Sequence, residues 1–144
     1  MDSKKRKKYD TKYLEMAQIW SELSHAKRTK VGAILVKDNT IIADGYNGTP
    51  QGFENDCEDE QNTTKWYVLH AEANAILKVA RSTQSSQDST LYVTLSPCKE
   101  CAKLIVQAGI KRVLYTSEYR DATGVEFLQK TGIDCQKMDI PPHT

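Results

Sequence analysis

The sequence predicts an α/β fold in which helices pack on a central five-stranded sheet. Two observations predict it. Strand-like apolar runs alternate with helical patterns along most of the chain, which is typical of helices that cover a sheet. The first two apolar runs are separated only by a short turn sequence, which indicates a hairpin. At 144 residues the chain fits one domain with a single hydrophobic core.

The first half of the chain begins with a helix and a hairpin. A helix is predicted over residues 10–25, because apolar residues recur there at the spacing i, i+3, i+4, i+7. Strands are predicted at 31–36 and 41–43, joined by a sequence with turn chemistry. Residues 45–52 hold three glycines and a proline, so we expect a loop whose backbone approaches a ligand closely. Residues 53–66 are polar and acidic and predict a solvated surface loop.

The second half alternates between helices and strands. The predicted order is helix 70–81, a polar connector at 82–89, strand 90–95, helix 97–108, strand 111–116, helix 124–131 and strand 133–138. Ser96 is expected to cap the helix that follows it, with Pro97 in the first helical position, because both residue types are favoured there. Gly109 is expected to end that helix.

Charge is distributed unevenly along the chain. With Asp2, the run Lys4-Lys-Arg-Lys-Lys8 gives the first eight residues a net charge of +4, whereas the remaining 136 residues carry −3. We therefore expect a basic flexible tail at 1–9, one folded domain at 10–139 and a short C-terminal tail at 140–144. A basic run is typical of a nucleic-acid or targeting tail or of a solvated terminus. The acidic body argues against a polynucleotide ligand.

The sequence also indicates the cellular compartment of the protein. No apolar run approaches the roughly 20 residues of a membrane span, and no apolar segment follows the basic run as in a secretory signal. We therefore expect no membrane partner and a cytoplasmic location, in which the four cysteines are reduced thiols or metal ligands.

Two short motifs carry the predicted chemistry. His70-x-Glu72 is followed by Pro97-Cys98-x-x-Cys101, and this combination is a signature of zinc-dependent deaminases. His70, Cys98 and Cys101 would supply one nitrogen and two thiolates to a tetrahedral Zn²⁺, with the fourth position left for water, as in catalytic zinc sites. Alone, Cys98-x-x-Cys101 would also suit a redox pair.

The predicted secondary structure explains why these residue types suit the site. Both motifs fall at helix starts, where the partial positive charge favours thiolates. Glu72 lies two residues beyond the histidine and is expected to transfer protons rather than bind metal. A bound zinc lowers the pKa of its water from 15.7 toward ~7.

These motifs resemble the cytidine deaminase superfamily and, within it, the deoxycytidylate deaminases. The resemblance spans roughly residues 10–138. It rests on Arg28 with Val31-Gly-Ala, on Gly45 to Gly52, on His70-Ala-Glu-Ala-Asn-Ala-Ile76 and on Leu91 to Cys101. It implies a three-layer α/β/α sandwich with a mixed sheet. It also implies zinc-dependent deamination of dCMP to dUMP and ammonia, which supplies dUMP for thymidylate synthesis.

The resemblance implies roles for individual residues. Zinc would lie on His70, Cys98 and Cys101, with hydroxide formed there attacking C4 of the base and Glu72 shuttling protons. The implied substrate contacts are Asn47 at the deoxynucleoside, the backbone of Ala71 and Ser96 at the pyrimidine edge, Tyr119 beside the nucleotide, and Arg28 and Lys30 at the phosphate, with Arg81 as a third cation.

Regulation is also implied, since members of this group tend to be homohexamers activated by dCTP and inhibited by dTTP. We predict an effector nucleotide with Mg²⁺ between the glycine-rich loop, which includes Gly48, and the acidic run that begins at Glu54; Arg81 is a further candidate. Some relatives carry a second, structural zinc. Ala26 stands where one of its cysteine ligands would be, so we expect one zinc per chain.

Two alternatives remain open at this point. A related deaminase would act on free cytidine or deoxycytidine, on guanine or on tRNA adenosine. A tRNA enzyme should have a basic body, and a nucleoside enzyme would not need Arg28 and Lys30. A non-catalytic zinc module would need a fourth protein ligand, and neither Cys57 nor Cys135 has the spacing for it.

Overall fold

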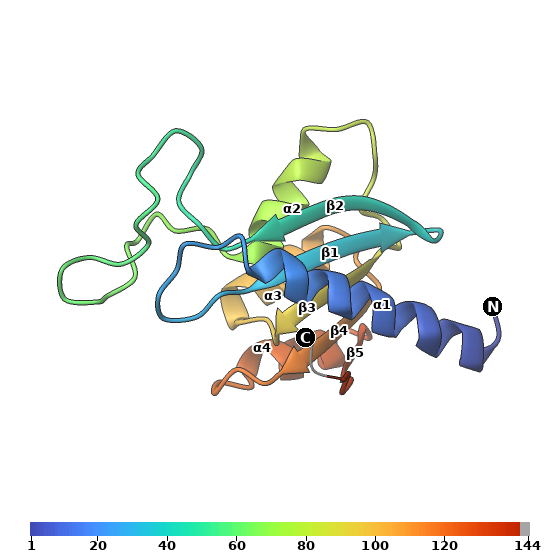
Figure 1. Cartoon of the computed structure of the whole chain (residues 1–144). Coiled ribbons are helices and arrows are strands. Elements are labelled where there is room, and N and C mark those ends of the chain that lie inside the picture. Colours follow the sequence, from blue (N-terminus) through green and yellow to red (C-terminus); the bar gives the residue numbers. More distant parts are fainter. Residues whose placement is uncertain (142–144) are drawn as a thin grey trace.

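The computed structural model describes residues 1–141, in which helices and strands follow the predicted order. The elements are α1 Ser3–Ser21, β1 Gly32–Lys37, β2 Thr40–Tyr46, α2 Ala71–Ala80, β3 Thr90–Leu95, α3 Lys99–Gln107, β4 Arg112–Ser117, α4 Thr123–Lys130 and β5 Asp134–Lys137. The strands form one sheet in the order β2-β1-β3-β4-β5 (Figure 1). β1 is antiparallel to both of its neighbours, whereas β3, β4 and β5 are parallel. The predicted mixed five-stranded sheet is confirmed.

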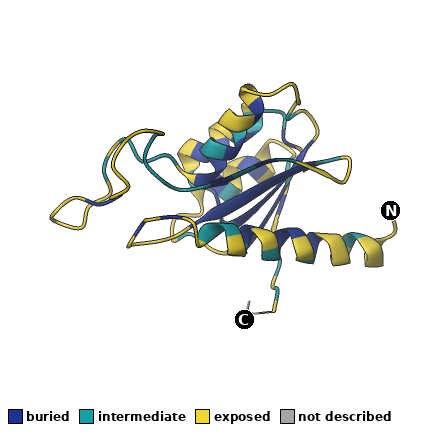
Figure 2. Cartoon of the chain, turned by 45° about the horizontal axis from the view of Figure 1, so that its top comes forward, coloured by how far each residue is buried: buried dark blue, intermediate teal, exposed yellow. Residues whose placement is uncertain are grey.

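Successive side chains along each strand point to opposite faces of the sheet and so divide the core into two layers. Ile34, Tyr92 and Leu114 lie in register across the sheet and pack with the buried side chains of α1. The residues next to them in each strand, such as Leu35 and Val113, face the opposite side and pack against α2, α3 and α4. Figure 2 shows the buried sheet between α1 on one side and α2 on the other. The predicted three-layer sandwich therefore follows from the period of two in β-strands.

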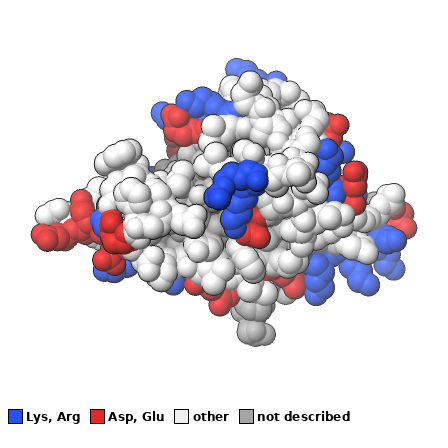
Figure 3. Space-filling model, turned by 90° about the horizontal axis from the view of Figure 1, so that it is seen from above, with Lys and Arg blue, Asp and Glu red and all other residues white. Residues whose placement is uncertain are grey.

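α1 begins seven residues earlier than predicted, so the flexible tail expected at 1–9 is corrected to helix from Ser3 onward. Asp2 caps this helix, because its carboxylate accepts a hydrogen bond from the backbone N–H of Lys5 at 2.8 Å. Lysine and arginine are also good helix formers. The first turns extend past the edge of the sheet (Figure 1), and Lys and Arg side chains gather at this end of the molecule (Figure 3).

The structure describes only the first part of the predicted C-terminal tail. The predicted C-terminal tail at 140–144 includes residues 142–144, which lie outside the described residues. None of the helices within residues 1–141 combines the length and the apolar character needed to cross a membrane.

A buried ion pair fixes α1 on the sheet. The carboxylate of Asp10 accepts hydrogen bonds from the Tyr92 hydroxyl at 2.5 Å and from the two terminal nitrogens of Arg112 at 2.9 and 2.6 Å. Only 3% of the Asp10 side chain and 19% of the Arg112 side chain are exposed. Because Tyr92 lies on β3 and Arg112 on β4, this contact sets the position of α1 relative to both strands.

The hairpin of β1 and β2 is longer than predicted and supports α2. Asp38 and Asn39 form its turn with φ of 50° and 59°, which matches a tight turn with left-handed residues. β2 runs on to Tyr46 and includes Gly45, so the predicted loop at 45–52 begins two residues later than expected. A Cβ atom at Gly45 would lie 2.4 Å from the backbone oxygen of Ala71. The absence of a side chain therefore allows the start of α2 to pack directly on β2.

Candidate metal centre and substrate pocket

Three predicted zinc ligands converge at one point. The Nδ1 atom of His70 lies 3.5 Å from the sulfur of Cys98 and 3.3 Å from the sulfur of Cys101. The ligand atoms of all three side chains lie within 4.8 Å of one another. One imidazole nitrogen and two thiolate sulfurs at this separation fit the donor set of a catalytic zinc site, which keeps one position for water.

Helix starts place these ligands. His70 is the N-cap of α2 and Cys98 is the N-cap of α3, each with extended backbone, while Cys101 lies in the first turn of α3. The predicted cap at Ser96 and first helical position at Pro97 are therefore wrong by two residues. The reason is that the Ser96 hydroxyl accepts a hydrogen bond from the backbone N–H of Tyr119 at 2.6 Å. This bond commits Ser96 to the loop after β4.

Hydrogen bonds from Cys101 and then His70 lower the pKa of Cys98 to about 3. The pKa of Cys101 is raised, first by its hydrogen bond to Cys98 and then by burial. The hydrogen bond to Cys98 also raises the pKa of His70. These hydrogen bonds favour the thiolate form of Cys98. A metal cation would replace the proton that these groups share, which fits zinc binding.

Glu72 supplies a buried carboxyl group beside this cluster. It lies in the first turn of α2 and is 4% exposed. Burial is the main cause that raises its pKa to about 7. A carboxyl group with a pKa close to neutral exchanges protons readily in both directions, which is the property expected of a general acid and base.

A cavity of about 200 Å³ opens next to the metal cluster, and its wall includes His70, Glu72 and Cys98. Five predicted substrate contacts lie on the same wall: Arg28, Asn47, Ala71, Ser96 and Tyr119. The fold thus brings together predicted contact residues that are as far apart in the chain as positions 28 and 119.

Two predicted cations lie elsewhere. Lys30 is exposed and lies outside the wall of this cavity. Arg81 is the C-cap of α2, at the opposite end of that helix from Glu72. Ten helical residues span about 15 Å, so the prediction of Arg81 as a third phosphate cation is wrong for this pocket.

Two asparagines hold backbone segments near the pocket through their side chains. The side-chain oxygen of Asn47 accepts from the backbone N–H of Val31 at 2.9 Å, and its amide nitrogen donates to the backbone oxygen of Thr29 at 2.8 Å. The amide of Asn74 donates to the backbone oxygen of Tyr46 at 2.8 Å. Asn74 therefore joins α2 to the end of β2, and Asn47 holds the start of β1 as well as lining the cavity.

The loop between β2 and α2 supplies wall residues that the sequence did not indicate: Cys57, Glu58, Thr64 and Val68. The prediction of a solvated loop is wrong at its centre, where Cys57 is 1% and Glu58 8% exposed. Cys57 is the only apolar residue between Glu54 and Asn62, and this was the one available signal. No local pattern distinguishes Glu58 from its exposed acidic neighbours.

The predicted effector residues already have partners. The carboxylate of Glu54 binds the Tyr67 hydroxyl and, at 3.2 Å, the Lys65 ammonium group, and these contacts lower the pKa of Glu54 to about 2. The backbone of Gly48 exchanges two hydrogen bonds with Leu69, at 3.0 and 2.8 Å. An effector or Mg²⁺ at this position would have to replace these bonds, so the structure gives the predicted Mg²⁺ site no support.

Known proteins that are similar to this chain belong to the family that its motifs resemble. Residues 7–117 match the family model of the cytidine and deoxycytidylate deaminase zinc-binding region. The deoxycytidylate deaminase of Schizosaccharomyces pombe is 34% identical over 151 residues, covering 95% of this chain and 46% of that protein. The probable deoxycytidylate deaminase of Caenorhabditis elegans is 40% identical over 116 residues, covering 76% of this chain and 57% of that protein. The chain thus spans about half the length of these two relatives.

A solved structure matches over nearly its whole length. The crystal structure of the dCMP deaminase from the cyanophage S-TIM5 in complex with dCMP and dUMP has a TM-score of 0.88 and 45% sequence identity to this chain. The match covers 96% of this chain and 99% of that one.

Proposed function

The chain belongs to the family defined by the cytidine and deoxycytidylate deaminase zinc-binding region, and on this basis we propose that it hydrolyses dCMP to dUMP and ammonia. The observation that carries the proposal is the convergence of His70, Cys98 and Cys101 beside a buried carboxyl group in one pocket. The similarity to a protein crystallised with dCMP and dUMP supports the choice of substrate.

The metal would be held by His70, Cys98 and Cys101, with one zinc per chain. When bound, zinc supplies a nucleophile near neutral pH by lowering the pKa of water to about 7. His70 and Cys98 lie on the wall of the cavity that the amidine carbon of a pyrimidine would enter, so the metal would supply its nucleophile there.

Glu72 moves the protons. Its carboxylate accepts a proton from the attacking water and delivers it to the ring nitrogen N3. It later transfers the second proton of that water, from the hydroxyl group on C4, to the departing amino group. The overall change consumes one water and releases one ammonia. Burial of Glu72 supports this role, because it raises the pKa of the carboxyl group to about 7 and so allows both halves of the cycle.

Arg28 recognises the 5′-phosphate. It lines the same pocket as His70 and Cys98, and it carries the planar guanidinium that pairs well with phosphate oxygens. Asn47, Ala71, Ser96 and Tyr119 also line this pocket, which supports their predicted contacts with the deoxynucleoside.

Release of ammonia from dCMP, deoxycytidine and CMP tests this function on zinc-loaded protein. We expect kcat/KM for dCMP to exceed that for deoxycytidine by roughly 10- to 100-fold, the usual effect of a charge-assisted contact. A preference for deoxycytidine over dCMP, or activity on guanine or tRNA adenosine alone, would favour the alternative deaminases.

We further propose, from the family resemblance, a homo-oligomer, with a hexamer as the expected state, and regulation by dCTP and dTTP. A sigmoidal dependence of rate on dCMP that dCTP makes hyperbolic is the expected behaviour, since an effector acts through different affinities for two states. A hyperbolic curve that neither nucleotide alters would exclude this regulation. Because zinc binding requires reduced Cys98 and Cys101, we propose a reducing compartment such as the cytoplasm.

A further inference from the structure

Residues 57–65 form a tight turn within the loop that precedes α2. The backbone oxygen of Cys57 accepts from the N–H of Lys65 at 2.8 Å, and the N–H of Asp59 donates to the oxygen of Thr63 at 2.9 Å. The carboxylate of Asp59 accepts from the N–H groups of Gln61 and Thr63 at 2.9 and 3.0 Å. This pattern of backbone and Asx-type bonds gives Glu58 a fixed position.

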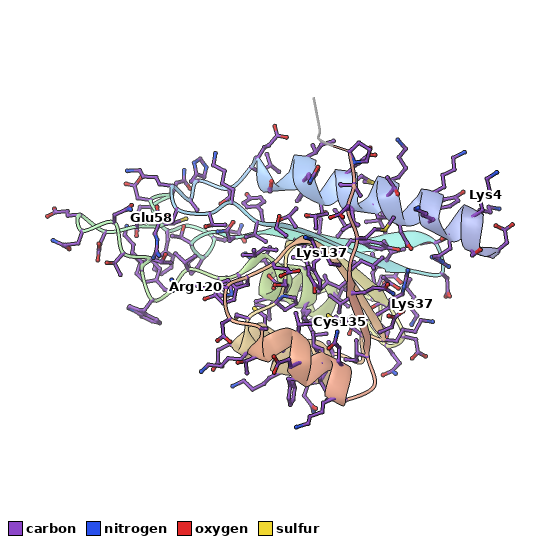
Figure 4. The ribbon with its side chains drawn as sticks, turned by 90° about the horizontal axis from the view of Figure 1, so that it is seen from below. Lys4, Lys37, Glu58, Arg120, Cys135 and Lys137 are labelled. Carbon is purple, nitrogen blue, oxygen red and sulfur yellow. The ribbon has the colours of Figure 1, made fainter. Side chains whose placement is uncertain are left out.

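Glu58 uses that position to hold a distant backbone segment. Its carboxylate oxygens accept from the backbone N–H of Lys27 at 3.1 and 3.0 Å and from that of Arg28 at 3.1 Å. Residues 22–31 between α1 and β1 form neither helix nor strand, so their N–H groups depend on such contacts. In Figure 4 the loop that carries Glu58 lies beside this segment.

The side chain of Arg28 lies against the same turn. Its Nη1 atom is 3.5 Å from the hydroxyl oxygen of Thr64, and Thr64 pairs with Glu58 across the turn. Both the backbone and the guanidinium of Arg28 are therefore adjacent to the turn, and Arg28, Glu58 and Thr64 all line the pocket.

We propose that Glu58 is a positioning residue for phosphate recognition: by binding the backbone of Lys27 and Arg28, it directs the Arg28 guanidinium into the pocket. This inference rests on the proposed function and adds a residue to its phosphate site. The proposed role of Glu58 also predicts whether its removal weakens or strengthens phosphate binding. Two like charges repel, so removal of a carboxylate near a phosphate should by charge alone strengthen phosphate binding, whereas loss of a positioning residue weakens it.

Binding of the product dUMP and of its nucleoside deoxyuridine to zinc-loaded protein tests the proposal without turnover. We expect Glu58→Ala to raise the Kd for dUMP roughly tenfold, as for loss of a charge-assisted contact, and to leave the Kd for deoxyuridine within about twofold. Glu58→Gln keeps one acceptor oxygen and should recover part of the loss. Gln61→Ala changes an exposed side chain of the same turn and serves as the matched control.

A double-mutant cycle shows whether Glu58 acts through Arg28. In an Arg28→Ala background, Glu58→Ala should change the Kd for dUMP by less than about twofold, because coupled residues are not additive. Full additivity would overturn the proposal, as would tighter dUMP binding or equal losses for dUMP and deoxyuridine in the single variant. If Glu58→Ala does not fold, the same comparison is made with Glu58→Gln.

Different results would contradict the proposed deaminase function and the positioning role of Glu58. A wild-type protein that releases no ammonia from dCMP contradicts the proposed function, whatever the ratio of the two dissociation constants. A wild-type protein that deaminates dCMP, with a Glu58 variant that loses dUMP and deoxyuridine affinity equally, contradicts only the positioning role.

Discussion

Glu72 illustrates how one residue acquires its chemistry from its surroundings. The sequence places it two residues after His70, and the fold buries it in the first turn of α2. Burial disfavours the charged form of a carboxyl group, which brings the pKa of Glu72 to about 7. The same residue on an exposed helix would remain ionised and would be a poor proton donor.

Glu72→Gln keeps the size and polarity of the side chain but removes its ability to transfer a proton. We expect zinc content and dUMP affinity to be retained and kcat to fall by about 10²- to 10⁴-fold, the usual range for a general acid or base. Metal analysis, dUMP binding and the rate of dUMP formation measure these three quantities. Turnover close to that of the wild type would remove Glu72 from the mechanism.

Arg28→Ala should raise KM for dCMP by about 10- to 100-fold, because a charge-assisted hydrogen bond is worth about 1.5–3 kcal/mol, and should change KM for deoxycytidine little. Lys30→Ala is the comparison, and its effect should be the smaller one because Lys30 lies outside the pocket wall. Steady-state kinetics on both substrates provide the values. Equal losses on the two substrates would make the role of Arg28 structural.

At the scale of whole elements, the sequence pattern predicts those helices and strands whose positions depend on neighbouring residues in the chain. The strands and α2 lie close to their predicted positions, because alternation and helical periodicity reflect burial directly. The start of α3 was misplaced because Ser96 binds the backbone of Tyr119, a residue on another loop. The role of Glu58 could not be predicted, because its partners lie about 30 residues earlier in the chain.

The attachment of α1 to the sheet makes a prediction about stability. Asp10→Ala leaves Arg112 without its buried partner, and breaking a buried ion pair costs about 3–5 kcal/mol. Because Arg112 is 19% exposed, we expect a loss of about 3 kcal/mol in the free energy of unfolding. Glu15→Ala removes a solvent-exposed pair with Lys12 and should cost less than about 1 kcal/mol. Urea unfolding measures both, and similar small losses would contradict the structural role of Asp10.

At the scale of the whole molecule, the sheet gathers the site at one edge. Ser96 and Tyr119 follow the parallel strands β3 and β4, and the carboxyl ends of parallel strands are where α/β folds bind ligands. The starts of α2 and α3 meet at the same edge and bring His70 beside Cys98. The fold therefore brings two motifs that are distant in sequence together as one group of candidate metal ligands, and the spacing within each motif already indicates this chemistry.

The central claim is that one zinc ion, held by His70, Cys98 and Cys101, makes this pocket a deaminase. Titration of metal-free protein with Zn²⁺, with dUMP formation from dCMP followed at each step, tests it most directly. We expect no turnover at the start, then a linear rise in rate, and a plateau at one zinc per chain. Full turnover without metal, or a plateau reached only at two zinc ions per chain, would contradict it.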